Sequence, residues 1–222
     1  IRLSLVGSEM CIRDRFLGIE NPNVSCKAVV TGNVGSGKTV LTRRFCMDIS
    51  SKLEGKRKVS IAHVNCRNHP SSSQVLQQIA LSLDSGHPER GFSSAEVIQN
   101  IRRNLRHHDS HLILILDEVD VLIRRDSSDL IYKLLRIDED QEGDGSLSLI
   151  LVSQEESLFS LFEKAIKSRL GASNGIKLGP YAAIDLEGIA RQRYDAACRP
   201  GSISDEVLTK IGAFAEESGG DA

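Results

Sequence analysis

The string VVTGNVGSGKTV, close to the amino end of the chain, has the composition and spacing of a phosphate-binding loop. Gly32, Gly35 and Gly37 allow the backbone to turn tightly and to bring bare N–H groups against a phosphate. Lys38 supplies a mobile cation for the outer phosphates, and the hydroxyl of Thr39 is suited to bind Mg²⁺. The alternative is an ordinary glycine-rich turn before a helix. The residues expected to contact a nucleotide are Gly32, Asn33, Val34, Gly35, Ser36, Gly37, Lys38, Thr39 and Val40.

A second group of candidate residues follows an aliphatic run, LILIL at 112–116, which leads into Asp117 and Glu118. When such a strand lies downstream of a phosphate loop, Asp117 is expected to hold Mg²⁺, mostly through water, and Glu118 to polarise an attacking water. Without the phosphate loop, the same string would indicate a buried strand followed by a solvated acidic turn. The combination predicts a site that hydrolyses a nucleoside triphosphate.

Two polar residues further along the chain are candidates for the same site. Gln154 follows a strand expected at 148–152, where it would sense the γ-phosphate or the attacking water; an ordinary polar strand cap is the alternative. Arg169 lies near the end of a helix expected at 158–170 and is a candidate arginine finger. A lone arginine at that position usually only complements the helix dipole, so both interpretations of Arg169 stay open.

The elements that must carry these residues alternate between strands and helices. Ser72 is the expected N-cap of one helix, and Ser93 with Glu96 has the spacing of a capping box at the start of the next. The alternation predicts an α/β fold with a parallel five-stranded sheet flanked by helices. Strands are expected at 27–31, 58–65, 112–116, 148–152 and 176–178, and helices at 38–53, 71–83, 93–106, 129–135 and 158–170.

The alternation of strands and helices ends at Pro180, a residue that interrupts regular secondary structure. Two helical stretches follow without a further strand, so we expect a nucleotide-binding core over 16–180 and a small helical lid over 181–222. Residues 1–15, IRLSLVGSEMCIRDR, do not fit this organisation. They look like translated sequencing-adapter sequence, and we expect them to be non-native; a genuine amino-terminal strand is the alternative.

Bulk properties restrict the class of protein. The chain has 222 residues and a formal net charge of −2, so no global basic field argues for nucleic-acid binding by this chain alone. No run of 18 apolar residues suggests a membrane span. The five cysteines are scattered without a CxxC pair, which is typical of reduced thiols in a cytosolic protein.

Together these features resemble an AAA+ ATPase and, within that group, the archaeal initiator family related to origin-recognition and cell-division-control proteins. The phosphate-loop and Asp-Glu strings are shared by thousands of ATPases, whereas several other strings are more specific. The resemblance extends over residues 23–222. It is carried by VNCRN at 64–68, LILDEVDVLI at 114–123, DLIYKLLR at 129–136, KSRLG at 167–171, GPYAAIDLEGIARQR at 179–193 and the terminal GDA.

This resemblance implies a switch that binds ATP or ADP with Mg²⁺, hydrolyses ATP slowly and acts in origin recognition and helicase loading. It implies that Tyr181 and Arg193 contact the nucleotide and that Arg169 reaches the ATP of a neighbouring AAA+ subunit. The segment 66–92 matches a DNA-contacting insertion of the family. The other implied partners are DNA, bound mainly through a winged-helix domain absent from this chain, and a replicative helicase. A cytoplasmic, nucleoid-associated protein with no membrane partner is expected.

The sequence also departs from the family pattern. Gln154 stands where the family usually has an asparagine, which bears on the hydrolysis rate more than on binding. The lid arginine that normally follows GDA would lie past Ala222, so we expect this chain to bind ATP more weakly than the whole protein. Two alternatives remain: a P-loop signalling or transposition-helper ATPase that acts through a protein partner, and a protein in which nucleotide is only a structural switch.

Overall fold

The structure is a computed structural model of the chain. It describes residues 16–21, 24–88, 91–126, 128–137, 147–171 and 174–220. Residues 1–15 and the last two residues of the GDA string lie outside the described residues. So does the string DEDQEGDG at 138–145, whose acidic and turn-forming residues predict an exposed loop.

The centre of the fold is a five-stranded sheet, and every strand pair in the described residues is parallel. The strand order is β2-β3-β4-β1-β5, so the strand that leads into the phosphate loop lies between β4 and β5. This confirms the predicted α/β fold with a parallel five-stranded sheet. The strands are β1 (Lys27–Gly32), β2 (Lys58–Asn65), β3 (Ser110–Asp117), β4 (Leu147–Ser153) and β5 (Gly175–Leu178).

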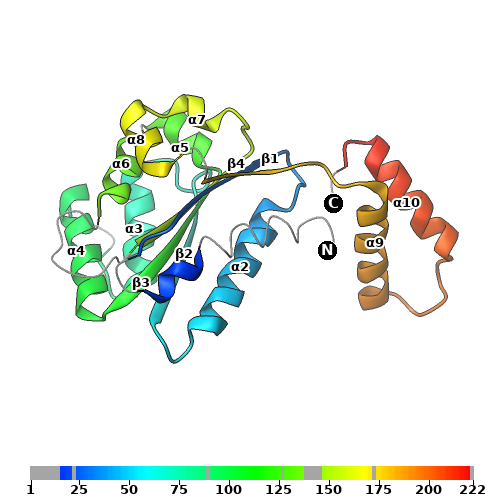
Figure 1. Cartoon of the computed structure of the whole chain (residues 1–222), viewed down its shortest axis with the longest axis horizontal. Helices are drawn as coiled ribbons and strands as arrows, with labels where there is room; N and C mark the ends of the chain where they lie inside the picture. The colour runs from blue at the N-terminus through cyan, green and yellow to red at the C-terminus, as the bar shows by residue number, and fades with distance from the viewer. Residues whose placement is uncertain are drawn as a thin grey trace.

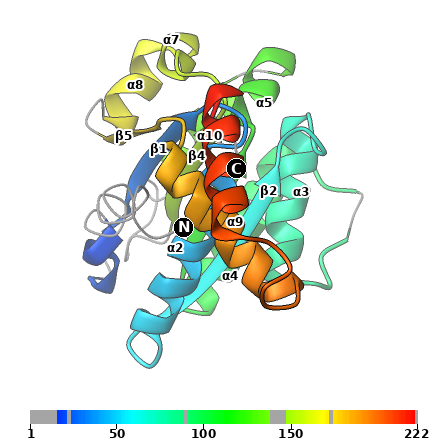
Figure 2. The ribbon, with the colours of Figure 1, turned by 90° about the vertical axis from the view of Figure 1, so that its right-hand side faces the viewer.

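Helices cover both faces of the sheet, as Figures 1 and 2 show. Alternate side chains of β3 point to opposite faces: Leu112 and Leu114 pack with one group of helices, whereas Ile113 and Ile115 pack with α2. The first face is covered by α3 (Ser72–Leu83), α4 (Ser94–His107), α5 (Val119–Arg125), α6 (Asp129–Leu135), α7 (Leu158–Leu161) and α8 (Lys164–Leu170). The second face is covered by α2 (Lys38–Leu53) and by the short helix η1 (Leu17–Glu20).

The N-caps of α4 and α3 can be compared with the N-caps predicted from local sequence. The capping box at Ser93 and Glu96 is present, as predicted. The predicted N-cap of α3 was wrong by one residue, because Ser71, not Ser72, accepts the N–H of Gln74. The N–H of Ser72 is instead bound by the carboxylate of Asp126, which lies far away in the sequence.

The single helix expected at 158–170 is two helices, α7 and α8. The backbone is extended at Phe162 and Glu163, and the Phe162 side chain is buried in the core at that break. Leu158, Phe162, Ile166 and Leu170 keep a helical spacing across the interruption, so periodicity alone does not reveal it. Helix α5, directly after the Asp-Glu pair, was also not predicted.

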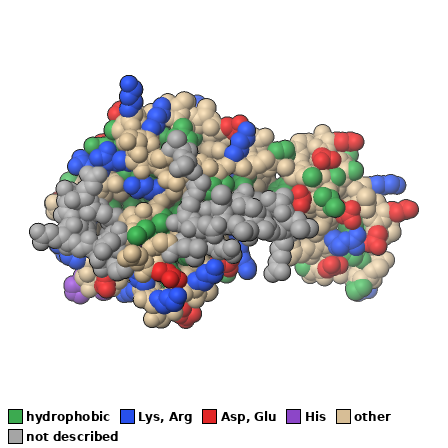
Figure 3. All heavy atoms as spheres, viewed as in Figure 1, with side chains coloured by type: hydrophobic (Ala, Val, Ile, Leu, Met, Phe, Trp, Pro, Cys, Tyr) green, Lys and Arg blue, Asp and Glu red, His purple; other side chains and the backbone are tan. Residues whose placement is uncertain are grey.

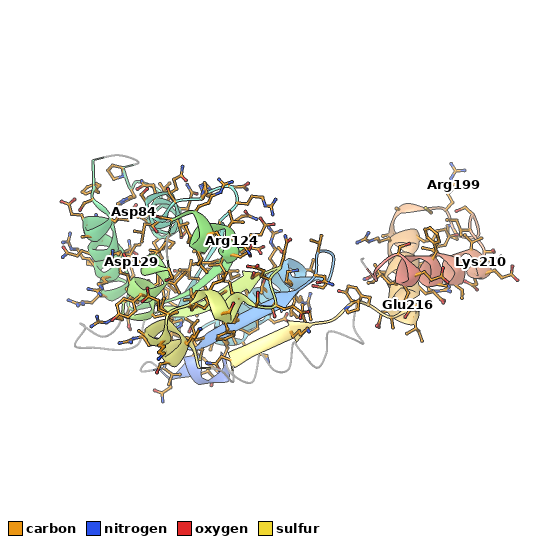
Figure 4. The ribbon with its side chains drawn as sticks, turned by 90° about the horizontal axis from the view of Figure 1, so that it is seen from above. Asp84, Arg124, Asp129, Arg199, Lys210 and Glu216 are labelled. Carbon is orange, nitrogen blue, oxygen red and sulfur yellow. The ribbon has the colours of Figure 1, made fainter. Side chains whose placement is uncertain are left out.

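The segment expected to form the lid, for which we keep that name, contains α9 (Ala183–Ala197) and α10 (Asp205–Glu217), which pack against each other after β5. In α10, a Cβ added to Gly212 would lie 2.5 Å from the carbonyl oxygen of Ala183, so the absence of a side chain allows the two helices to approach closely. Figures 1 and 4 show the lid standing apart from the sheet and its helices, with Arg199, Lys210 and Glu216 projecting from it.

The surface carries charges of both signs. On the face drawn in Figure 3, basic and acidic side chains are interspersed over both the core and the lid. No helix among the described residues has the length and apolar character needed to cross a membrane.

Candidate nucleotide-binding site

The phosphate loop connects the end of β1 to the start of α2, and two glycines determine its shape. A Cβ added to Gly32 would lie 2.5 Å from the carbonyl oxygen of Leu178 in β5 and 2.9 Å from Oγ of Ser36, so only glycine fits between the strand and the loop. Gly37 is the N-cap of α2 and has a left-handed backbone, with φ +81°. The N-terminus of this helix therefore opens at the loop, where its N–H groups suit an anion.

Lys38 lies over the loop and is almost completely buried. Its Nζ donates hydrogen bonds to the carbonyl oxygens of Gly32, at 2.7 Å, and Asn33, at 2.5 Å, and lies 3.4 Å from Oγ of Ser36. These acceptors carry no formal charge, and phosphate oxygens would accept stronger hydrogen bonds from the same ammonium group. The loop thus holds the Lys38 ammonium group against its own carbonyl oxygens.

Thr39 and Asp117 meet although 78 residues separate them. Oγ1 of Thr39 donates to Oδ2 of Asp117 at 2.8 Å, while Oδ1 of Asp117 accepts the N–H of Glu118 at 3.0 Å. Burial, the largest single influence, acts to raise the pKa of Asp117, but hydrogen bonds from His63 and Thr39 outweigh it and hold this pKa below its ordinary value. An ionised carboxylate beside a hydroxyl oxygen is a set of hard ligands that fits Mg²⁺.

Glu118 adopts a left-handed backbone conformation, with φ +53° and ψ +43°, between β3 and α5. Such a conformation is uncommon outside glycine and costs free energy, and it often marks a functional position. Oε1 of Glu118 accepts a hydrogen bond from Nε2 of Gln154 at 3.2 Å. Because β3 and β4 are neighbours, their carboxyl ends bring these two predicted residues together.

Arg67, which was not predicted as a site residue, also contacts Glu118. Its Nε donates to Oε2 of Glu118 at 2.5 Å. Oδ1 of Asn65 accepts the N–H groups of Arg67 and Asn68, at 2.9 and 3.3 Å, and so holds the turn after β2. The VNCRN string placed Arg67 just after a strand, but the contact with Glu118 also required that β2 lie beside β3, which the structure shows.

A cavity of about 290 Å³ connects these groups. Neither Tyr181 nor Arg193 lines this cavity. Tyr181 is buried at the base of the lid, where its N–H donates to the carbonyl oxygen of Gly220, and Arg193 is exposed on α9. Their contacts with nucleotide stay predictions. The cavity is lined by Val34, Gly35, Gly37, Lys38, Thr39, Val40, Asp117, Glu118 and Gln154.

Arg169 lies away from the cavity, on α8. Its guanidinium is 5.2 Å from the ring centre of Tyr132 in α6, and that of Arg136 is 5.4 Å from the same ring. A residue that acts on a neighbouring subunit would not contact its own phosphate loop, so the finger role of Arg169 also stays a prediction.

Comparison with known proteins shows the family of this chain. A family model described as an AAA domain matches residues 27–162, which include the phosphate loop, the Asp-Glu pair and Gln154. The chain belongs to the AAA domain family. The chain is 31% identical over 189 residues to ORC1-type DNA replication protein 2 of Saccharolobus solfataricus, an alignment that covers 83% of the chain and 45% of that protein.

Solved structures share the fold of this AAA domain. The ORC1 protein of Aeropyrum pernix in complex with DNA superposes with a TM-score of 0.86 at 24% identity, over 100% of the chain and 57% of that protein. The ORC2 protein of the same organism, in ADPNP–ADP complexes, gives 0.87 at 22% identity, over 100% and 59%. The chain spans about half the length of the curated relatives it matches.

Proposed function

We propose that this AAA domain is the ATP-binding module of a DNA replication initiator, in which ATP and Mg²⁺ bind at the phosphate loop and slow hydrolysis acts as a switch. The observation that carries the proposal is the meeting of Glu118 and Gln154 beside Thr39 and Asp117 at one edge of the sheet. The initiator role is supported by the similarity to ORC1-type DNA replication proteins.

The phosphate loop performs the binding part of the mechanism. The Lys38 ammonium and the N-terminus of α2, a helix of 16 residues, would attract the phosphate oxygens. Thr39 and Asp117 would hold Mg²⁺, which when bound neutralises charge on those oxygens. Catalysis of phosphoryl transfer depends mainly on such positioning and electrostatic stabilisation.

Glu118 and Gln154 perform the chemical part. A carboxylate at the position of Glu118 would accept a hydrogen bond from the attacking water and orient it. The amide of Gln154 already donates to Glu118 and would carry the state of the γ-phosphate to it. Arg67 competes with water for Oε2 of Glu118, so this ion pair must loosen for the carboxylate to act.

The proposed partners follow from the initiator role. DNA engagement would depend on the nucleotide state and would use parts of the whole protein in addition to this chain, whose net charge is only −2. A neighbouring AAA+ subunit would be contacted by Arg169, and the replicative helicase would be the downstream partner. We propose the same cytoplasmic, nucleoid-associated setting for the whole protein.

Two variants of the full-length protein test the hydrolytic role. Lys38→Ala should abolish binding of a fluorescent ATP analogue, because the loop then lacks its cation. Glu118→Gln should retain that binding and lower single-turnover hydrolysis of labelled ATP by at least about 100-fold. Hydrolysis by Glu118→Gln at the unmodified rate would show that the role of Glu118 is wrong. Turnover that requires Glu118 would also exclude a purely structural nucleotide.

A further inference from the structure

His63, near the carboxyl end of β2, contacts Asp117, the carboxylate proposed to hold Mg²⁺. In β2, Ala62 and Val64 point into the core on the α3 and α4 side, so His63 points to the opposite face, toward α2. Asp117 continues the β3 positions Ile113 and Ile115, which also face α2. Strand alternation therefore brings the His63 ring and the Asp117 carboxylate to the same side of the sheet.

The helix on that face supplies a second partner for His63. Nε2 of His63 lies 3.3 Å from Oδ2 of Asp117, and Nε of Arg43 lies 3.3 Å from Nδ1 of His63. Arg43 follows Thr39 by four residues in α2, so the two side chains occupy the same side of the helix. One helix face thus contacts both ends of the His63–Asp117 pair.

The hydrogen-bond network assigns the tautomer of the imidazole. Arginine can only donate, so Nδ1 of His63 must accept the hydrogen bond from Arg43. The proton of the neutral ring is then on Nε2, which donates to the Asp117 carboxylate. If the proton were on Nδ1 instead, the N–H of His63 would face the N–H of Arg43, and the lone pair of Nε2 would face the Asp117 carboxylate.

We propose that His63 is a positioning residue that orients Asp117 toward the metal, with Arg43 fixing the tautomer that makes this possible. The inference rests on the proposed function, because it assigns a role within the same ATP and Mg²⁺ site. Partners that orient a metal-binding carboxylate typically change metal affinity by about 10- to 100-fold when they are removed. His63 is 20% exposed as a side chain and Asp117 is 7% exposed, so water replaces this hydrogen bond poorly.

Mg²⁺ titration of the chain in the presence of a fluorescent ATP analogue tests the role. His63→Phe keeps a planar ring and loses the donor; it should raise the Mg²⁺ concentration at half-maximal response by about 10-fold. Binding of the analogue in EDTA should stay within about two-fold, because His63 does not contact the phosphate loop. The Mg²⁺ midpoint of His63→Gln should lie between that of the unmodified chain and that of His63→Phe. His107→Phe, an exposed histidine on α4, is the matched control and should leave both values unchanged.

The outcomes separate this inference from the proposed function. If Asp117→Asn shifts the Mg²⁺ midpoint and His63→Phe leaves it unchanged, the positioning role is wrong while the site stands. If neither Lys38→Ala nor Asp117→Asn alters binding of the analogue or of Mg²⁺, the proposed function fails and the inference fails with it.

A second measurement avoids substituting His63. Nitrogen-15 NMR of the unmodified chain should show His63 with its proton on Nε2, and Arg43→Leu should introduce the other tautomer. An Nδ1–H tautomer in the unmodified chain would overturn the proposal, even if His63→Phe failed to fold.

Discussion

Gly32 provides the sharpest test of how the fold builds the phosphate loop. Gly32 is paired with Leu178 in the register of β1 and β5, and an added Cβ would lie 2.5 Å from the Leu178 carbonyl oxygen. That neighbour is backbone, so it can move only if β5 separates from β1. Overpacking of this kind typically lowers the free energy of unfolding by about 1–3 kcal/mol. We expect Gly32→Ala to lie in the upper part of this range, at about 2–3 kcal/mol.

The assay is thermal unfolding followed by nucleotide binding. For a chain of this size, 1 kcal/mol corresponds to about 2–4 °C, so Gly32→Ala should lower Tm by about 5–10 °C. It should also weaken binding of an ATP analogue, because the Gly32 carbonyl that holds Lys38 is displaced. Gly188→Ala is the matched control: Gly188 is exposed inside α9, its added Cβ meets nothing within 4 Å, and alanine should stabilise that helix by about 0.5–1 kcal/mol.

A lower Tm for Gly32→Ala together with a higher Tm for Gly188→Ala would support the close approach of β5 to Gly32 as the cause. If Gly32→Ala melts within about 1 °C of the unmodified chain and binds the analogue equally well, the close approach of β5 does not constrain the loop. A parallel loss of Tm in Gly188→Ala would show that the effect is not specific to Gly32.

Two further predictions concern the lid and the metal carboxylate. Gly212→Ala should loosen the packing of α10 on α9, because its Cβ would lie 2.5 Å from the Ala183 carbonyl oxygen; hydrogen exchange should accelerate in α9 and α10 and stay unchanged in β3, and equal protection throughout would contradict this. The pKa of Asp117 is held below its ordinary value of 3.8, so its ionisation contributes stability that is fully present above that value and is lost as pH falls through the lower folded pKa. In urea unfolding, the difference between the unmodified chain and Asp117→Asn should therefore shrink below about pH 4, and a constant difference down to about pH 2 would refute the shift.

Features that depend on neighbours in the sequence were predictable. The bounds of α2 and β2 were predicted to the residue, and the capping box at Ser93 and Glu96 was confirmed. Helix α2 and the capping box depend on hydrogen bonds that span a few residues, and β2 was recognised from its local run of residues, although its ladder hydrogen bonds join it to the distant β3. The break at Phe162 was missed because the same apolar spacing continues through it. Ser71, not Ser72, is the N-cap of α3, and the N–H of Ser72 binds the distant Asp126.

The order of the strands decided which site side chains meet, and the periodicity of the sequence does not contain that order. Glu118 meets Gln154 because β3 lies beside β4, and it meets Arg67 because β3 also lies beside β2. The contact of His63 with Asp117 additionally requires that both side chains point toward α2.

By itself, the sequence determined the phosphate loop, the Asp-Glu strand end and the α/β class, since these depend on residue type, short spacing and local hydrogen bonding. Only the tertiary structure decided which polar side chains surround Asp117 and Glu118. The physical reason is that the carboxyl ends of parallel strands gather at one edge of the sheet, and their order along that edge is set by the packing of the whole core, not by any local stretch of the chain.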